Sequence, residues 1–322
     1  EDLIAQTTGK GLLGFRKTVL NVMDDHTDIE YLSFYTLNTS RAILYPSYTE
    51  KRSYGDDAYI SREFYTYSIS TFGTNSRGYR LQLTKKQLLD NLNNTSCVTT
   101  YSSYSNGQPT VISVDYGANV KSKVEYKDLV ANSTYNIFLP QTKVETKSSG
   151  SASVSYTSKY TYDDKFRLIK SIDLYGTDKA VTTTNSYTTK GNLSYSQVSA
   201  SGCETQTTSY DYTGSGRFVS KKVTPDGVTT IYSWDDALRR IAKETTSVGT
   251  LSYVTTYNTY DGFNNCLKST LPDGRISTRT ITYGDGRSPA ACLYQVKTTL
   301  TGSPEKIEMF DSNGNNTRVT TT

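Results

Sequence analysis

The chain has 322 residues, and its 35 basic and 31 acidic residues give a formal net charge of +4. The basic residues form no run or stripe, which argues against nucleic acid as a partner, and no stretch approaches the roughly 20 apolar residues of a membrane span. With 28 Tyr against 9 Phe and one Trp, the composition favours a curved sheet with amphipathic Tyr and Thr faces over a thick apolar core.

The first residues resemble a cofactor motif but fit a strand better. Residues 9–15 match the G-x-G-x-x-G pattern, which binds dinucleotides only when a strand precedes it and a helix follows it. Here Arg16–Val22 is typical of a strand, so we expect a Gly-rich bend and no cofactor. Residues 24–28 form a predicted turn that contains His26, and Tyr31–Thr36 is the returning strand of a first hairpin.

Further hairpins follow along the chain. Tyr45–Tyr54 and Ala58–Ile69 are predicted strands that residues 55–57 join in a turn. An aromatic-led turn and another strand are predicted over Tyr104–Ile112.

Two stretches interrupt this pattern. Thr84–Asp90 has helical character, with Thr84 as its cap, and predicts one or two helical turns between hairpins. Tyr126–Asn136 is either a short helix or an irregular crossing. We therefore expect at most one or two short helices in the chain.

From Ile137 onward, two kinds of marker recur with a period of about 25 residues. Aromatic residues open the first turns, and glycines mark the second turns. The aromatic residues are Tyr162, Tyr187, Tyr210, Trp234, Tyr260, Tyr283 and Phe310. The glycines are Gly150, Gly176, Gly202, Gly227, Gly249, Gly274 and Gly302.

These markers predict β-hairpins, because tight connections need residues at positive φ and a neighbouring Asp can bond its own backbone. The segments between the turns, such as Val228–Trp234 and Ile276–Tyr283, are rich in residues that favour strands. The residues that we expect to hold the turns are Asp211, Gly227, Asp235, Asp261, Gly262, Gly274, Asp311 and Gly314.

The sequence therefore predicts an all-β chain of about ten stacked antiparallel hairpins that form a curved or spiralling sheet. Residues 137–322 carry the regular repeats, and residues 1–136 form a less regular hairpin region that is continuous with them. Only one strand follows the turn at residues 311–314, which would leave half a hairpin unpaired. We expect the chain to be a segment of a longer protein.

The repeat resembles a known family. Tyr260-Asp261-Gly262 at a first turn and residues 272–275, Pro-Asp-Gly-Arg, at a second turn resemble the YD repeats of Rhs proteins and of the B and C components of Tc insecticidal toxin complexes. The opening residues 9–15 look like the segment that precedes such repeats in Tc-type and secreted bacterial Rhs proteins. The resemblance is clear over residues 137–322 and looser over residues 1–136.

The resemblance implies strands that spiral into a hollow shell around a C-terminal toxic domain. It also implies a secreted or cell-surface bacterial protein whose partner is that toxin domain or another segment of the same polypeptide.

The sequence offers no complete set of catalytic residues. His26 is the one histidine, and without a second histidine or a G-x-S-x-G motif a Ser-His-Asp or Cys-His centre lacks its parts. Neighbouring carboxylates at 24–25, 56–57, 163–164 and 235–236 fall in predicted turns, where Asp accepts backbone N–H groups. We therefore expect no catalytic residue, although a glycosidase that uses paired carboxylates is an alternative hypothesis.

The sequence gives equally little support for a metal site or a disulfide. Residues 311–316 begin like an EF-hand loop, but Asn316 and Thr322 stand where Gly and Glu are needed, so only weak calcium binding by turn carboxylates is left open. One His and four scattered Cys give no zinc cluster. Cys266 and Cys292 hold the same place in successive repeats, roughly 9.6 Å apart and beyond the ~7 Å limit for a disulfide.

We predict a non-enzymatic scaffold, a YD-repeat shell segment that encloses or carries a toxin or effector domain. The alternative is an extracellular adhesion or carbohydrate-binding module that presents exposed Tyr and Thr to glycans or cell-surface proteins.

Overall fold

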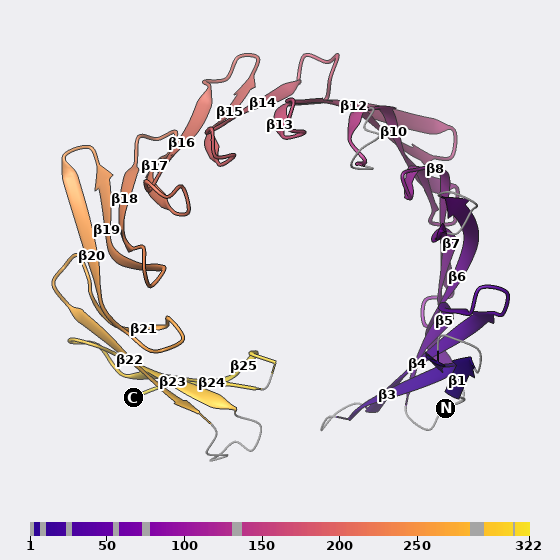
Figure 1. Cartoon of the computed structure of the whole chain (residues 1–322), viewed down its shortest axis with the longest axis horizontal. Coiled ribbons are helices and arrows are strands. Elements are labelled where there is room, and N and C mark those ends of the chain that lie inside the picture. The colour runs from indigo at the N-terminus through magenta and orange to yellow at the C-terminus, as the bar shows by residue number, and fades with distance from the viewer. Residues whose placement is uncertain are drawn as a thin grey trace. The chain divides into compact units, whose positions relative to one another are not determined.

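The computed structural model describes residues 3–6, 11–23, 28–53, 58–72, 78–130, 137–283, 293–311 and 313–322. These residues form twenty-five strands and no helix (Figure 1). They group into two compact units, residues 1–182 and residues 183–322. The all-β prediction is confirmed. The predicted change from irregular to regular repeats at residue 136 is a separate matter from this division and stays a prediction.

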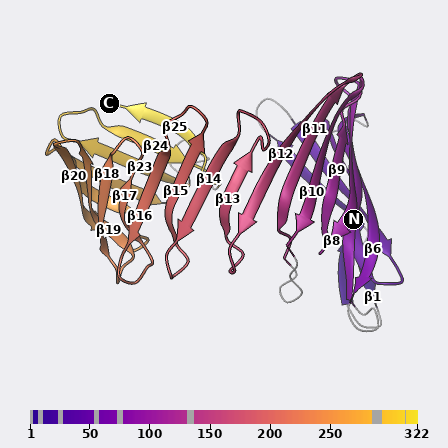
Figure 2. The same ribbon diagram turned by 90° about the horizontal axis from the view of Figure 1, so that it is seen from above.

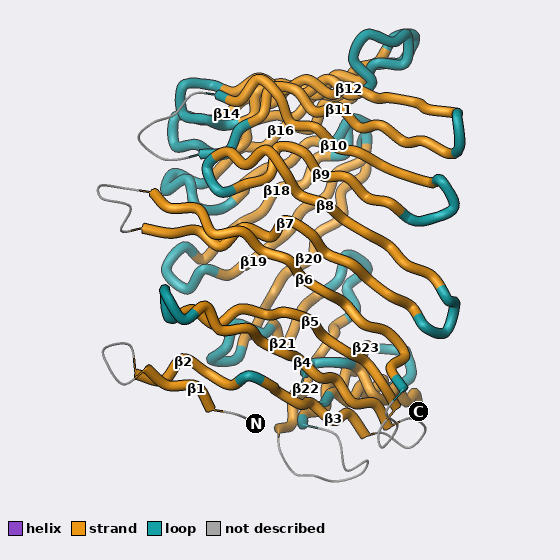
Figure 3. Tube along the Cα trace, turned by 90° about the vertical axis from the view of Figure 1, so that its right-hand side faces the viewer, coloured by secondary structure: helices purple, strands orange, loops and turns teal. Residues whose placement is uncertain are grey.

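The first unit is a ladder of long strands. It contains β1 (Leu3–Gln6), β2 (Gly11–Phe15), β3 (Lys17–Met23), β4 (Asp28–Asn38), β5 (Ile43–Ser53), β6 (Tyr59–Phe72), β7 (Gly78–Asp90), β8 (Thr95–Ser105), β9 (Gln108–Asp115), β10 (Val120–Leu129), β11 (Pro140–Ser149), β12 (Ala152–Tyr162) and β13 (Leu168–Asp173). From β3 to β13, each strand pairs antiparallel with the next one in the chain. β1 and β2 pair only with each other (Figure 3).

The second unit repeats the arrangement with shorter strands. β14 (Val181–Tyr187) contains the boundary, and β15 (Leu193–Ala200), β16 (Gln206–Tyr212), β17 (Val219–Val223), β18 (Thr229–Asp235), β19 (Arg240–Val248), β20 (Leu251–Tyr260), β21 (Cys266–Thr270), β22 (Ile276–Tyr283), β23 (Tyr294–Leu300), β24 (Lys306–Phe310) and β25 (Asn316–Thr321) follow. From β15 to β25, each strand again pairs antiparallel with its successor. Figure 2 shows the hairpin turns of this unit at two opposite edges of its sheet.

Three early hairpins lie where the sequence predicts them. The pairs are β3 with β4, β5 with β6, and β8 with β9. The predicted turns at residues 24–28 and 55–57 lie outside the described residues, apart from Asp28, which is the first residue of β4. His26 belongs to the first of these turns and also lies outside the described residues.

The predicted helix at Thr84–Asp90 is wrong. These residues belong to β7, where Lys86 is opposite Tyr65 on one side and opposite Thr99 on the other. Pairing on both sides outweighs the helical preference of Lys, Gln and Leu, because a central strand satisfies every backbone group. In the second ambiguous stretch, Tyr126–Leu129 continues β10, so this part is a strand as well, and residues 131–136 lie outside the described residues.

Few side chains are fully buried. Among the described residues the buried apolar side chains are Ile4, Leu32, Ala42 and Val296, and only Leu32 is almost completely enclosed, with 1% of its surface exposed. Most other side chains along the strands are half-buried or exposed. The sheet is therefore held largely by its backbone ladder and by cross-strand side-chain pairs rather than by a thick core.

Candidate functional site

The most distinctive feature of the repeats is a β-bulge in front of five of the first turns. The pairing register shifts at or immediately before Tyr162, Tyr212, Trp234, Tyr260 and Phe310. A bulge inserts one residue and re-aims the side chain that follows it. The same irregularity in five repeats means that the aromatic side chain in front of the turn has a defined direction.

Four of these aromatic side chains donate a hydrogen bond to the strand before their own. Tyr212 Oη lies 2.9 Å from the carbonyl oxygen of Leu193, the first residue of β15, and Trp234 Nε1 lies 2.7 Å from that of Val219, the first residue of β17. Tyr260 Oη bonds the carbonyl of Ile241 in the same manner. In the first unit, Tyr162 Oη lies 3.0 Å from the carbonyl oxygen of Pro140.

The acceptor carbonyls of Leu193, Val219 and Ile241 each follow the first turn of the preceding repeat, so these three bonds connect successive repeats along one edge of the sheet. Trp234 adds a stacking contact, with its ring 4.4 Å from that of Phe218. Partial burial raises the pKa of Tyr212 and of Tyr260, because the ionised phenolate is less well solvated there. These tyrosines therefore stay neutral donors at physiological pH.

The Asp that follows the aromatic residue organises the turn itself. Asp261 Oδ1 accepts the N–H groups of Phe263 and Asn265 at 2.9 and 2.8 Å, and its Oδ2 accepts Asn265 Nδ2 at 2.8 Å. Asp311 makes the corresponding bonds with the N–H groups of Asn313 and Asn315 at 2.8 and 2.9 Å. Such bonds favour the charged carboxylate, and they lower the pKa of both Asp residues.

The predicted turn residues do not all have the same role in their turns. Gly227, Gly274 and Gly314 have φ of 79°, 81° and 79°. Gly262 lies in its turn, but the positive φ of that turn, 65°, belongs to Asn264. Asp235 ends β18, and its Oδ1 accepts the N–H of Leu238 at 3.1 Å.

Asp211 is not a turn residue. It lies in β16, opposite Lys221, and the turn begins two residues later at Thr213. The Tyr210-Asp211 pair imitates the motif, but Tyr212-Thr213 occupies its place, since the bulge and the aromatic hydrogen bond belong to Tyr212.

In two first turns a Thr stands in the place of the Asp, at Thr188 and Thr213. The turn after Tyr187 was predicted from the sequence, but the role of Thr188 and the position of the turn at Thr213 were not. Thr188 Oγ1 accepts the N–H of Asn192 at 3.2 Å, and Thr213 Oγ1 lies 2.9 Å from Ser215 Oγ. The spacing could have revealed them, because an aromatic residue precedes each Thr and a Gly with positive φ follows three residues later, at Gly191 and Gly216.

Within the described ranges, no group of three or more His, Cys, Asp and Glu side chains could hold a metal ion. Of the neighbouring carboxylate pairs, those at 24–25 and 56–57 lie outside the described residues, and Asp163 is held in its turn by the N–H groups of Lys165 and Arg167. Cys97, Cys203 and Cys266 are free thiols, and Cys292 lies outside the described residues. No helix in the described part of the chain has the length and apolar character of a membrane span.

No protein-family model matches the chain, and no curated protein sequence matches it. Solved structures do match. A crystal structure of TcdB2-TccC3-TEV superposes over 96% of this chain with a TM-score of 0.56 and 13% sequence identity. The chain has the fold of part of TcdB2-TccC3. A crystal structure of TcdB2-TccC3-Cdc42 superposes over 95% of the chain with a TM-score of 0.50 and 13% identity. The matched regions cover 16% and 19% of those longer chains.

Proposed function

We propose that the chain is a non-enzymatic structural scaffold, a YD-repeat segment of a larger secreted or cell-surface bacterial protein that encloses or carries a toxin or effector domain. The observation that carries the proposal is the fold shared with part of TcdB2-TccC3 over 96% of the chain. The names of the two similar structures combine TcdB2 and TccC3 with a third component, TEV in one and Cdc42 in the other. By analogy, the repeats of this chain form part of a shell wall around a carried component.

The hydrogen bonds of the repeats are consistent with a function as a structural wall. Each hairpin widens the sheet, and the aromatic hydrogen bonds from Tyr212, Trp234 and Tyr260 attach each repeat to the one before it. Stability in such an array is a sum of repeat and nearest-neighbour contributions, so the sheet can extend without a central core. The turn carboxylates are engaged in holding the backbone and have no substrate to act on in this function.

Limited proteolysis of the full natural protein that contains these residues tests the proposal. We expect the repeat segment to resist cleavage as one piece and to protect a second segment of the same polypeptide. That second segment, expressed alone, is the control and should be cut rapidly by the same protease. If the natural protein has no other segment, or if its other segments are cut as fast in the full protein as alone, the carrying function is wrong.

A further inference from the structure

A shallow pocket of ≈ 530 Å³ lies on one face of the first unit, beside the hairpin turns that connect β9 with β10 and β11 with β12. Its volume is within the range of about 300–1,000 Å³ that ligand pockets occupy. The side chains that matter for its chemistry are Tyr116, Val120, Ser122, Lys147, Ser149 and Val154. None of them belongs to the aromatic-Asp turns.

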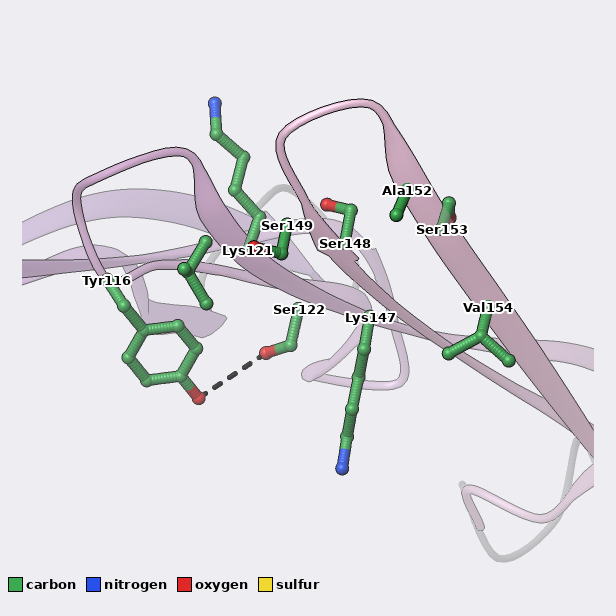
Figure 4. A pocket seen from close by; sticks show the side chains of 10 residues that line it. Tyr116, Lys121, Ser122, Lys147, Ser148, Ser149, Ala152, Ser153 and Val154 are labelled. Carbon is green, nitrogen blue, oxygen red and sulfur yellow. Dashed lines mark hydrogen bonds between the residues drawn. The ribbon is translucent and has the colours of Figure 1, made fainter.

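The strand register puts these side chains on the same face. Ser122 is opposite Lys147, and Lys147 is opposite Val154, so the three form one row across β10, β11 and β12. Figure 4 shows Tyr116, Lys147 and Val154 on one side of the strands. Lys121 also lines the pocket, but its ammonium group extends to the opposite side, where its Nζ lies 3.1 Å from Asp115 Oδ2.

The pocket is held by backbone hydrogen bonds. Tyr116 N donates to the Val120 carbonyl oxygen at 2.9 Å, which closes the turn that carries the tyrosine. Gly150 N donates to the Asn119 carbonyl oxygen at 3.1 Å and so connects the two neighbouring turns. Because both turns are fixed, a ligand would meet a preformed surface and little ordering would be needed on binding.

The lining combines an apolar surface, hydroxyl groups and a cation. The Tyr116 side chain is 53% exposed and that of Val154 is 45% exposed, so both present carbon to solvent. Tyr116 Oη lies 3.5 Å from Ser122 Oγ, which leaves both hydroxyls with capacity for further hydrogen bonds.

Lys147 supplies the uncompensated charge. Within the described part of the chain no carboxylate pairs with its ammonium group, and Glu145, two residues earlier on the same face, pairs with Lys143 instead. An exposed aromatic ring beside hydroxyl groups suits the C–H face and hydroxyls of a sugar ring. A free ammonium group beside them suits a carboxylate on that sugar.

We propose that this pocket binds an acidic sugar, with the ring on Tyr116 and Val154 and the carboxylate beside Lys147. The sugar's hydroxyls would exchange hydrogen bonds with Ser122 and Ser149. The site is independent of the scaffold function, since its residues lie apart from the aromatic-Asp turns.

Titration of the whole chain with two matched probes tests this proposal. Methyl β-D-glucuronide and methyl β-D-glucoside differ only in the carboxylate, and binding is measured by calorimetry and by saturation-transfer NMR. We expect the glucuronide to bind in the millimolar range and at least about threefold more tightly than the glucoside, as an exposed ion pair allows. The proposal would be overturned if the two probes bound equally well, or if neither probe bound at about 20 mM.

Variants locate the site. Lys147→Met should remove the preference for the glucuronide, and Tyr116→Ala should weaken both probes by about two- to tenfold. The matched controls are Lys121→Met, whose side chain extends to the other face, and Tyr253→Ala, which removes a similarly exposed tyrosine of the second unit. Unchanged melting temperatures show that the variants fold. If Lys121→Met has the effect expected of Lys147→Met, or if 3-phenylpropionate binds as well as the glucuronide, the sugar site is wrong.

Discussion

The early strands β4–β6 and the later strands β15–β25 both have rings that stack across strands, but they differ in the contacts that accompany the stacking. In the early strands, rings stack across neighbouring strands, with Phe34 4.2 Å from Tyr48 and Tyr48 5.7 Å from Phe64. Arg62 lies over the rings of Tyr48 and Phe64 and pairs with the buried Glu50. In the later strands rings stack as well, with Tyr294 4.8 Å from Phe310, but the contacts that recur from repeat to repeat lie at the turns. The repeat is therefore a property of turn chemistry, while the side chains on the strand faces vary from repeat to repeat.

The largest effect is expected where the early strands have a true core. Leu32→Ala should lower the free energy of unfolding by about 3 kcal/mol, because it removes a fully enclosed side chain and leaves a cavity. Urea unfolding measures the change. The control is Leu20→Ala on neighbouring β3, where the side chain is 62% exposed. Equal effects of the two substitutions would contradict the assignment of a core to β4.

The second turns of the later strands should come next. Gly274 has φ of 81° with nothing within 4 Å of an added Cβ, so Gly274→Val tests backbone strain alone. We expect a loss of about 1–3 kcal/mol, since a β-branched residue is strained at positive φ. Thermal unfolding measures it, and Gly227→Val should behave alike at φ of 79°.

Gly262→Val is the matched control. Gly262 also has nothing within 4 Å of an added Cβ, but no positive φ is required of it. It should leave the melting temperature nearly unchanged. A similar loss at Gly262 and Gly274 would mean that turn glycines matter for a reason other than φ.

These residues show which parts of the structure can be predicted from the sequence and which cannot. The glycines of the second turns are visible because a backbone at positive φ restricts the residue type directly. Thr213 stayed hidden because a hydroxyl can replace the carboxylate of a first turn, while Tyr210-Asp211 imitated the motif inside a strand. Thr84–Asp90 was mistaken for a helix because pairing with β6 and β8 depends on residues far away in sequence.

The candidate site shows the same limit. The aromatic residues of the repeat were predicted, but their bonds to the preceding strand depend on a bulge that no local pattern marks. The pocket around Lys147 was not predicted at all. Its residues come from three strands, and only the register brings Ser122, Lys147 and Val154 into one row.

The aromatic hydrogen bonds should have a smaller effect than the turn glycines. Tyr212→Phe removes the hydroxyl that bonds the Leu193 carbonyl and should cost about 1 kcal/mol. The effect should appear in hydrogen exchange as faster opening of β15 and β16, because the bond connects these two strands. Tyr195→Phe, on an exposed side chain of β15, is the control. Unchanged exchange in Tyr212→Phe would mean that the bond does not connect the repeats.

Alkaline pH should weaken all these tyrosine bonds together. Burial raises the pKa of Tyr162, Tyr212 and Tyr260 above the ordinary value of 10.0. A group whose pKa is raised on folding contributes stability below its unfolded pKa and loses it as the pH rises through the folded pKa. The melting temperature should therefore fall above about pH 10. It should fall less steeply in Tyr212→Phe, which has one fewer tyrosine with a raised pKa.

The smallest effect is expected from acid at the first turns. Hydrogen bonds, chiefly from Asn265 and from Asn315, lower the pKa of Asp261 and of Asp311 below the ordinary value of 3.8. A carboxylate with a lowered pKa stabilises the fold above its unfolded pKa, and this contribution is lost as the pH falls through the folded pKa. The amide N–H groups of Phe263 and Asn265 should therefore lose protection from exchange below pH 3.8. In Asp261→Asn the side chain keeps a carbonyl acceptor but cannot titrate, so the same amides should show no such acid-dependent loss. If they lose protection equally in both proteins, the opening of the turn has another cause than protonation of Asp261.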